Sequence, residues 1–380
     1  MNMINKVRYS GRVQSGLLLS AVFLCSAYSA QSQQLAPESE RMAKLIPGPV
    51  DVSIKEWKVP TAGNVHDGRG GNVHDVSVAP DGSIWYAGQR AKVVGRFDPK
   101  TETFKEYTVD GNPNDLVVNK KDGSIMYASR RPHHIGKIDP KTGKISDYQM
   151  PSRNVRNSET GQSSTEQPFG PHTPAFDQKG NVWFTVGPRM EGSTNMLGML
   201  NPATGEFKYG NSEIPASKGN SYGIVVNSKG VPFFTIYRTN KLGSIDPVTL
   251  RIQEYEMPNP EASARRLAIT PDDVIWYADS DRGYLGRLDP KTGEFKEWPT
   301  PSGPKSHPYG ITTVGDIVWY SETAAPNTVV RFDPKTEKFQ SWALPSGGGV
   351  VRNMTADPQG NLWLALSGIN AIGKVEIRNR

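Results

Sequence analysis

Side chains that can bind ligands or move protons recur along this chain at a nearly regular spacing. They stand 40, 58, 50, 43, 44 and 43 residues apart, each about eleven residues before a bulky apolar or aromatic residue. Imidazoles titrate near neutral pH and suit general acid/base chemistry, whereas guanidinium groups bind anions. Such a set can act together only if the fold brings its members to one place. The seven residues are His74, Asn114, His172, Tyr222, Arg265, Tyr309 and Arg352.

The spacing belongs to a repeat of about 43 residues, of which the chain holds seven copies. Each copy opens with two alternating apolar runs around a turn such as Pro80-Asp81-Gly82, the pattern of a tight hairpin. A third run ends in a turn of the Asp-Pro-Lys-Thr-Gly type, as at 139–143, and a fourth run follows it. Four short antiparallel strands at this period predict one blade of a β-propeller. We therefore expect an all-β, seven-bladed propeller of four-stranded antiparallel blades.

All eight tryptophans fall at two positions of this repeat. One position is in the second run, and its residues are expected to pack between neighbouring blades, because each blade can bury its faces only against the next. The other is in the fourth, outer run, where Trp57, Trp298 and Trp342 stand and the remaining copies have tyrosine. The second-run residues are Trp85, Met126, Trp183, Phe233, Trp276, Trp319 and Trp363.

The seventh copy ends before its outer run, since only three residues follow Ile377. Residues 52–59 match the outer-run pattern but precede the first copy. We predict that they pair into the last blade and close the ring, which also removes two exposed sheet edges. The propeller then spans 51–380 as one domain.

The N-terminus has the features of an export signal. Three basic residues precede an apolar run at 17–24, and small residues follow up to Ala30. The run is too short to span a membrane. We expect a signal peptide over 1–30 with cleavage near Ala30, a polar leader over 31–50, and a periplasmic or secreted protein. Cys25 is the sole cysteine and lies in the signal, so the mature chain can form no disulfide.

Charge gives no indication of a nucleic-acid partner. The formal charge is +6, of which three positive charges belong to the predicted signal, leaving +3 for the rest. No basic run with interleaved aromatics is present, and the repeated lysines fall on predicted turns. We expect a monomer whose partner is a small-molecule or anionic ligand, with no nucleic acid and no membrane span.

A propeller brings the first strand of every blade to its central channel, so the seven spaced residues should meet there. The second strands return to the same face and add Gln89, Arg130, Asp279 and Glu322. Glu322 and Asp279 are candidate oxygen ligands for a divalent cation, Mg²⁺ or Ca²⁺. Salt bridges to Arg265 or Arg266 are an equally good interpretation of these two carboxylates.

The histidines of the repeat can be interpreted as catalytic groups or as polar residues that only line the channel. His74 and His172 are candidate acid/base groups, but polar groups that line a channel can also just hydrogen-bond to water and to each other. His133 and His134 are expected near this face but outside the channel, and His66 near its rim. The polar insertion 151–170 joins two blades on this face and is expected to be a lid or a mobile loop.

The repeat resembles that of the streptogramin B lyases, also called virginiamycin B lyases, over about residues 52–378. The residues that carry the resemblance are 308–312 (Pro-Tyr-Gly-Ile-Thr), 275–277 (Ile-Trp-Tyr), 286–289 (Gly-Arg-Leu-Asp) and 297–301 (Glu-Trp-Pro-Thr-Pro). The resemblance implies a propeller whose relatives open the lactone of a cyclic depsipeptide by elimination. It also implies a histidine base and a magnesium ion held by glutamate.

The positions that match the family's catalytic residues carry other side chains in this sequence. Tyr309 and Arg352 stand where the family has histidines, and its two glutamates fall near Val350 and near 366–367. If the chain is a lyase, its site must be built differently. We assign His74, His172 and Tyr309 to catalysis, and Asn114, Tyr222, Arg265 and Arg352 to substrate binding.

Three functions remain open on the sequence alone. The first is a lyase that opens a cyclic ester at the channel mouth. The second is a metal-dependent, lactonase-like hydrolase, and the third is a noncatalytic propeller that binds a ligand or a protein, because a fold does not determine an activity.

Overall fold

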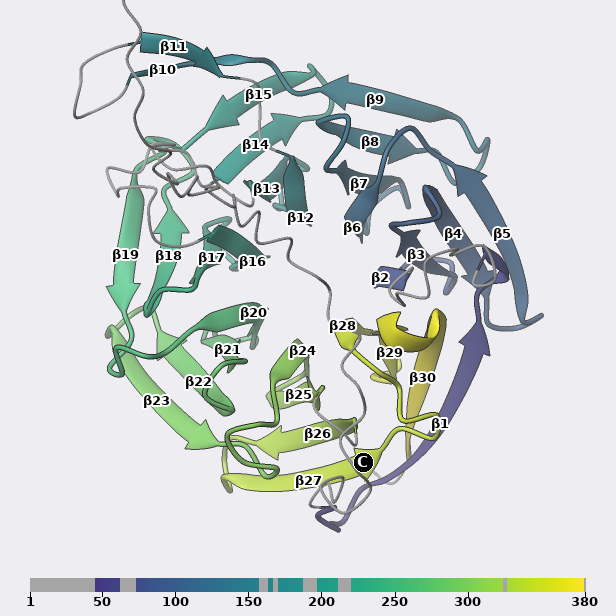
Figure 1. The fold of residues 1–380 in the computed structure, drawn as a ribbon, viewed down its shortest axis with the longest axis vertical. Coiled ribbons are helices and arrows are strands. Elements are labelled where there is room, and N and C mark those ends of the chain that lie inside the picture. Colours follow the sequence, from purple (N-terminus) through teal and green to yellow (C-terminus); the bar gives the residue numbers. More distant parts are fainter. Residues whose placement is uncertain are drawn as a thin grey trace, which may run out of the picture. The chain divides into compact units, whose positions relative to one another are not determined.

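The computed structural model describes residues 45–61, 73–156, 163–166, 170–186, 197–210, 220–323 and 327–378. The chain divides into two units, 1–31 and 32–380, and all the described residues belong to the second. The predicted signal, most of the predicted leader and His66 lie outside the described residues, so those interpretations stay predictions. In the second unit, seven four-stranded antiparallel sheets form a ring around a central axis (Figure 1). The predicted fold class is confirmed.

Six blades consist of four consecutive strands that follow one another from the axis outward. Blade 1 is β2 (Val73–Val78), β3 (Ile84–Gly88), β4 (Val93–Asp98) and β5 (Thr103–Thr108). Blade 2 is β6 (Pro113–Val118), β7 (Ile125–Ser129), β8 (His134–Ile138) and β9 (Ile145–Gln149). Blade 3 is β12 (Pro171–Phe176), β13 (Val182–Val186), β14 (Leu197–Asn201) and β15 (Glu206–Tyr209).

The second half of the chain continues the pattern. Blade 4 is β16 (Asn220–Val226), β17 (Pro232–Tyr237), β18 (Lys241–Ile245) and β19 (Ile252–Glu256). Blade 5 is β20 (Ala264–Ile269), β21 (Ile275–Asp279), β22 (Tyr284–Asp289) and β23 (Glu294–Pro299). Blade 6 is β24 (Pro308–Val314), β25 (Ile317–Glu322), β26 (Thr328–Asp333) and β27 (Lys338–Ala343).

Blade 7 joins the two ends of the ring. Its inner strands are β28 (Val351–Ala356), β29 (Leu362–Leu366) and β30 (Ala371–Arg378), with the 3₁₀ turn η3 (Ser367–Ile369) between the last two. Its outer strand is β1 (Asp51–Lys58), which pairs antiparallel with β30 along its whole length. The Trp57 ring stacks on Trp363 at 5.9 Å and lies 5.0 Å from Phe97 of blade 1. The predicted closing strand is confirmed, and it also seals the junction between blades 7 and 1.

The tryptophans of the second strands fill the spaces between blades, as predicted. All five are at most 2% exposed. Trp85, for example, packs with Leu116, Ile125 and Tyr127 of the next blade. Aromatic residues of the outer strands stack on them, as Trp298 does on Trp276 at 5.7 Å. Burial of such large apolar groups between neighbouring blades is the main stabilising contribution in a repeat fold.

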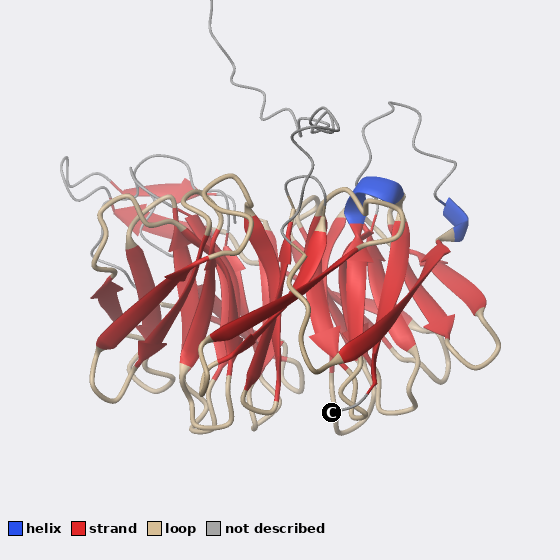
Figure 2. Cartoon of the chain, turned by 90° about the horizontal axis from the view of Figure 1, so that it is seen from below, coloured by secondary structure: helices blue, strands red, loops and turns tan. Residues whose placement is uncertain are grey.

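The two edges of the ring differ. In the edge-on view the short helical turns lie at one edge and the C-terminal end of the chain at the other (Figure 2).

The insertion 151–170 includes a two-stranded hairpin, β10 (Arg153–Arg156) and β11 (Ser163–Glu166). This hairpin lies at the outer rim rather than over the axis (Figure 1). Within the described residues no helix is long and apolar enough to cross a membrane.

A glycine on each of several third strands makes room for an aromatic ring of the strand beside it. At Gly95, an added Cβ would lie 2.0 Å from Cζ of Tyr86. The Tyr86 hydroxyl donates to Glu106 on the outer strand at 2.6 Å, which holds the ring in place. Tyr127 with Gly136 and Tyr277 with Gly286 repeat this arrangement.

We predict that Gly95→Ala lowers the free energy of unfolding by about 2–3 kcal/mol, because Tyr86 is fully buried and cannot move away from the new methyl group. Urea unfolding of the purified protein measures the change. Gly82→Ala is the matched control: it has no atom within 4 Å of the added Cβ and a φ of 84°, so it should cost only the left-handed strain of about 1 kcal/mol. Equal effects at the two positions would contradict the steric explanation.

Candidate functional site

Each first strand has a register irregularity at the residue that the repeat marked as a candidate. In blade 1, Val73 pairs with Gly88 and Asp75 with Ala87, which leaves His74 as the extra residue. Blade 5 shows the same shift. In the other five blades the candidate and the residue after it stand opposite one residue of the second strand. A bulge of this kind re-aims side chains. The residue after the candidate therefore also reaches the axis in several blades, namely Asp75, Asp115, Thr173, Arg266 and Asn353.

Asp115 is the centre of the contacts at the axis. It is fully buried and accepts hydrogen bonds from His74 Nδ1 at 2.7 Å and from the Thr173 hydroxyl at 2.5 Å. Arg266 donates to both of its oxygens, at 2.9 and 3.2 Å. These partners come from blades 1, 3 and 5, while Asp115 is in blade 2. We call Asp115, Arg266, Thr173, His74 and His172 the axial cluster.

The ion pair of Asp115 with Arg266 decides the charge of this cluster. Burial by itself would raise the pKa of Asp115, but the guanidinium of Arg266 and the hydrogen bond from His74 hold it well below its usual range. Burial likewise disfavours the charged form of Arg266, yet the charge of Asp115 raises the pKa of the guanidinium. Both groups are therefore ionised, and the pair spans the ring from blade 2 to blade 5.

The two histidines of the axial cluster are neutral at pH 7. Their ring centroids lie 5.9 Å apart, and the side chains are about 95% buried. Burial lowers the pKa of His74 to about 4, against the opposing effect of Asp115. Burial also lowers the pKa of His172 well below its usual value. His172 Nδ1 contacts the Thr173 hydroxyl at 2.8 Å.

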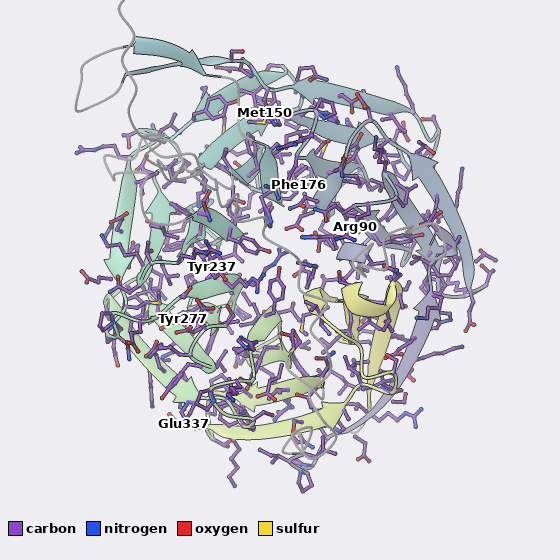
Figure 3. The ribbon with its side chains drawn as sticks, viewed as in Figure 1. Arg90, Met150, Phe176, Tyr237, Tyr277 and Glu337 are labelled. Atoms are coloured by element: carbon purple, nitrogen blue, oxygen red, sulfur yellow. The ribbon has the colours of Figure 1, made fainter. Side chains whose placement is uncertain are left out.

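A second group of side chains, from blades 4 to 7, faces the histidines. The hydroxyls of Tyr222 and Tyr309 form a short hydrogen bond. The Arg265 guanidinium lies 3.8 Å from the centroid of the Tyr309 ring, and the Tyr222 ring lies 4.2 Å from that of His172. Arg265 is also 5.4 Å from the ring of Tyr237, which ends the second strand of blade 4 (Figure 3).

The arginines reverse the usual effect of burial on Tyr309. Burial raises a tyrosine pKa, but the charges of Arg265, Arg352 and Arg266 together lower the pKa of Tyr309 to about 8. Burial and the charge of Tyr309 raise the pKa of Tyr222 instead. Of the two hydroxyls, that of Tyr309 therefore loses its proton first. No carboxylate in the described part of the chain lies within ion-pair distance of Arg265, and its Nε is buried without a partner.

The structure brings most of the predicted site residues together. His74, His172, Tyr222, Tyr309 and Arg265 form one connected set of contacts. Arg352 lies close enough to affect His74 and Tyr309 electrostatically, and its Nε donates to Ser367 at 2.9 Å. Asn114 is fully buried and accepts a hydrogen bond from Gln89.

Sequence reasoning did not assign Asp115, Thr173, Asp75 or Asn353 to the site. The available signal was that a polar residue directly follows the candidate in those copies, which strand alternation does not favour. Asp75 accepts a bond from Leu116 N of blade 2 at 2.8 Å and one from the Asn353 amide of blade 7. Burial and the nearby charge of Asp115 raise the pKa of Asp75 to about 7.

The two carboxylates expected to hold a cation are engaged elsewhere. Glu322 accepts hydrogen bonds from Ser302 and, at 2.9 Å, from Thr328. Asp279 forms a 2.7 Å ion pair with Arg282. The alternative salt bridge to Arg265 or Arg266 is wrong for Asp279, because Arg282 takes that place. Across the ranges that the structure describes, no three His, Cys, Asp or Glu residues gather into a possible metal site. A bound divalent cation stays a prediction.

His134 lies outside the axial cluster. His134 begins the third strand of blade 2, where it is fully buried and its Nε2 is 3.3 Å from Asp147. This agrees with the prediction that it stands outside the channel.

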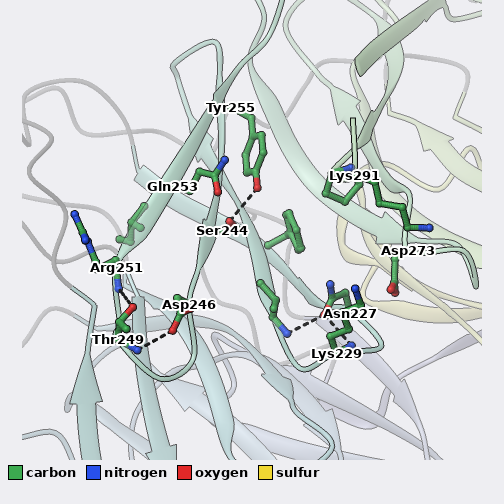
Figure 4. Close-up of a pocket in the computed structure, with 14 residues that line it drawn as sticks. Asn227, Lys229, Ser244, Asp246, Thr249, Arg251, Gln253, Tyr255, Asp273 and Lys291 are labelled. Atoms are coloured by element: carbon green, nitrogen blue, oxygen red, sulfur yellow. Dashed lines mark hydrogen bonds between the residues drawn. The ribbon is translucent and has the colours of Figure 1, made fainter. Parts of the chain in front are cut away.

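A separate pocket of about 570 Å³ opens among the turns between blades 4 and 5 (Figure 4). Phe233, Ser244 and Tyr255 are among the residues that line it. Its carboxylates cap turns: Asp246 accepts from the Thr249 N–H at 2.7 Å, and Asp273 from Ser228. This pocket holds no histidine and no set of groups suited to catalysis.

Comparison with known proteins supports the resemblance that the repeat predicted. Residues 207–380 match the model of the virginiamycin B lyase family. A streptogramin B lyase structure superimposes with a TM-score of 0.70 at 21% identity, covering 86% of this chain and 98% of that one. The virginiamycin B lyase from Staphylococcus aureus gives 0.69 at 20% identity, covering 86% and 99%. No curated protein matches the chain in sequence.

Propellers with other roles match as well. A hydrazine synthase from Kuenenia stuttgartiensis has a TM-score of 0.65 at 11% identity, covering 81% of this chain and 96% of that one. Extracellular domains of two B. thetaiotaomicron proteins superimpose with TM-scores of 0.58 and 0.60, at 15% identity. They cover 81% and 85% of this chain, and 40% and 42% of theirs. This chain is thus a virginiamycin B lyase-like seven-bladed propeller, and at these identities the likeness to solved structures establishes the fold alone.

We predict that Asp75 makes the stability of the protein depend on pH. Its pKa rises from 3.8 to about 7 on folding, so between these values the folded state binds more protons than the unfolded state. Stability from this group is therefore present at low pH and is lost as the pH rises toward 7. Asp75→Asn removes the titration, so its free energy of unfolding relative to the unaltered protein should increase with pH.

Urea unfolding at about pH 4.5 and about pH 8 measures this difference, and one pKa unit corresponds to about 1.4 kcal/mol. Asp316→Asn, on an exposed turn, is the control for the loss of one carboxylate. A constant difference between Asp75→Asn and the unaltered protein would show that Asp75 does not titrate in this range.

Proposed function

We propose that this propeller is a lyase that opens a cyclic ester by elimination at the axis, with Tyr309 as the base and Arg265 and Arg352 as the anion-stabilising groups. The observation that carries the proposal is the contact set of Tyr309. Its hydroxyl bonds to that of Tyr222, and the Arg265 guanidinium lies 3.8 Å from its ring. A phenol placed among cations is a stronger acid than usual, and its anion is the base that an elimination needs.

The reaction balances without water. Tyr309, as the phenolate, takes a proton from the carbon next to the one that bears the ester oxygen. The electron pair of that C–H bond forms a carbon–carbon double bond, and the C–O bond breaks to release a carboxylate. The opened product has the mass of the substrate.

The arginines supply what a metal supplies in related chemistry. A carboxylate develops in the transition state, and fixed positive groups in a water-poor site stabilise it strongly. Arg265 and Arg352 are half-buried, and Arg265 has no carboxylate partner among the described residues. A ligand anion can therefore approach both groups without displacing an existing ion pair at Arg265.

A noncatalytic binding propeller is the second candidate, and one observation favours it. Tyr309 is only 1% exposed, whereas Tyr222, Arg265 and Arg352 are more accessible. A ligand could then bind the accessible groups without reaching the phenol. The arginines would then serve only to hold an anion.

Incubation with a B-type streptogramin tests the lyase proposal, with magnesium in one sample and a chelator in another. We expect ring opening without mass gain in both. Tyr309→Phe should lower kcat about 100-fold or more, because it removes the general base and keeps the ring. Tyr107→Phe, on the outer strand of blade 1, is the matched control and should keep full activity. Chromatography and fragment mass analysis give the readout.

Each other outcome has a distinct meaning. An antibiotic that stays intact in both samples overturns the lyase proposal and favours the binding propeller. A product heavier by one water indicates a hydrolase. Activity that the chelator abolishes shows that a divalent cation takes part, against the assignment of that role to the arginines.

Anion binding is testable without a known substrate. We expect benzoate, a flat carboxylate suited to arginines beside tyrosine rings, to bind the purified protein. Arg265→Ala or Arg352→Ala should weaken its Kd about tenfold, the equivalent of one charged hydrogen bond. Calorimetry measures the affinity, and Arg251→Ala, in the pocket between blades 4 and 5, is the control. Equal binding of benzyl alcohol, or no effect of the two variants, would contradict an anion site at the axis.

A further inference from the structure

We infer that Asp115 is a positioning residue that holds His74 and His172 in the tautomer with hydrogen on Nδ1, so that two unprotonated Nε2 atoms serve as acceptors for the ligand. The use of these acceptors rests on the proposed function. The geometry that sets the tautomers does not, because it involves only side chains of this chain.

The tautomer of His74 follows from the state of Asp115. Arg266 donates to both oxygens of that carboxylate, at 2.9 and 3.2 Å, and an ionised carboxylate can only accept hydrogen bonds. His74 Nδ1 lies 2.7 Å from Asp115 Oδ1. The hydrogen between these two atoms must therefore be on Nδ1 of the imidazole.

Thr173 passes the same constraint on to His172. Its hydroxyl lies 2.5 Å from Asp115 Oδ2, so its single hydrogen is donated to the carboxylate. The oxygen of Thr173 can then only accept from His172 Nδ1, which lies 2.8 Å away. Hydrogen is on Nδ1 of the second imidazole as well. One carboxylate thus determines two tautomers, one directly and one through a hydroxyl.

The Nε2 atoms are left as acceptors. Neither makes a hydrogen bond with any residue that the structure describes, and both rings are nearly buried. Arg266 contributes positive charge near both histidines, with Arg352 acting on His74 and Arg130 on His172. Protonation of Nε2 would add a further charge to this cationic surrounding, so the neutral form is favoured.

The two sides of the site therefore suit different chemical groups of one ligand. Blades 1 and 3 offer the hydrogen-bond acceptors of His74 and His172, and blades 5 and 7 offer the cations Arg265 and Arg352. A matching molecule carries N–H or O–H donors close to its ester or carboxylate. The substrate class is therefore an ester that also bears amide or hydroxyl groups, rather than a purely apolar lactone.

The tautomers can be measured on the full protein labelled with ¹⁵N-histidine, by long-range ¹H–¹⁵N correlation spectra. His74→Gln and His172→Gln assign the two rings. In the unaltered protein we expect both rings to show a protonated Nδ1 and an unprotonated Nε2. Asp115→Asn should populate the Nε2–H form in both rings. Asp279→Asn is the control, because it also removes a buried carboxylate paired with an arginine but touches no histidine.

If Asp115→Asn does not fold, Thr173→Val tests the tautomers instead. It leaves the Asp115–Arg266 pair in place and should change the tautomer of His172 while His74 keeps its own. Nε2–H on either ring of the unaltered protein overturns the inference, as does an unchanged His172 in Thr173→Val. A purely structural role would change the unfolding midpoint but not this selective pattern.

The ligand class has its own readout. Hippurate adds an amide N–H to a carboxylate and should bind at least about fivefold more tightly than benzoate, the equivalent of one neutral hydrogen bond. Thr173→Val should reduce that difference. The tautomer spectra need no ligand, so a failed streptogramin assay leaves them valid, and wrong tautomers leave the elimination by Tyr309 untouched.

Discussion

The organisation of the axis depends on one buried ion pair, Asp115 with Arg266. The two residues are 151 positions apart in the chain and come from blades 2 and 5, yet both are almost completely shielded from solvent. Two charges buried in this way are tolerated only when each satisfies the other, and loss of one partner typically costs about 3–5 kcal/mol. The pair links blades on different sides of the ring, whereas the tryptophans link only neighbours. It also makes Asp115 a permanent acceptor, and the orientations of His74, Thr173 and His172 follow from that.

Burial acts on all the titratable groups at the axis, but their neighbours decide the result. Desolvation disfavours every charged form, so it lowers the pKa of the histidines and would raise that of Tyr309. Arg265, Arg352 and Arg266 oppose it for the phenol. Arginine charges reinforce it for the imidazoles, from Arg352 and Arg266 at His74 and from Arg266 and Arg130 at His172. The outcome is a site with neutral histidines on one side and an acidic phenol among cations on the other. This separation into acceptors and cations supports the proposal of a site for an ester or carboxylate.

The relation to the streptogramin B lyases is one of architecture, with different side chains at the axis. The sequence resemblance implies histidines at the positions of Tyr309 and Arg352, and the carboxylates that were candidates for a metal are bound to Arg282, Ser302 and Thr328. The bulged ends of the first strands face the axis, whereas apolar residues farther along the same strands, such as Val76 and Val78, belong to the core between blades. Side chains at the axis can therefore differ while the apolar positions of the blade are kept.

The architecture could be predicted from the sequence by itself, because it is encoded in local, repeated patterns. Apolar alternation, turn residues and the period of the aromatics predicted seven blades, and the displaced outer run at 52–59 predicted the closing strand that β1 provides. Spacing alone also predicted that His74, His172, Tyr222, Arg265 and Tyr309 would meet, since every first strand must face the axis.

The tertiary structure decided which of these groups interact and in what charge state. The bulge in each first strand brings a second side chain to the axis, and strand alternation gives no reason to expect Asp115 there. Nor could Arg266 be assigned to Asp115, because an ion pair between distant blades depends on the diameter of the ring and on the direction of each side chain. The pKa of Tyr309 and the tautomers of the histidines depend on those pairings, so they too emerge only when all seven blades are in place.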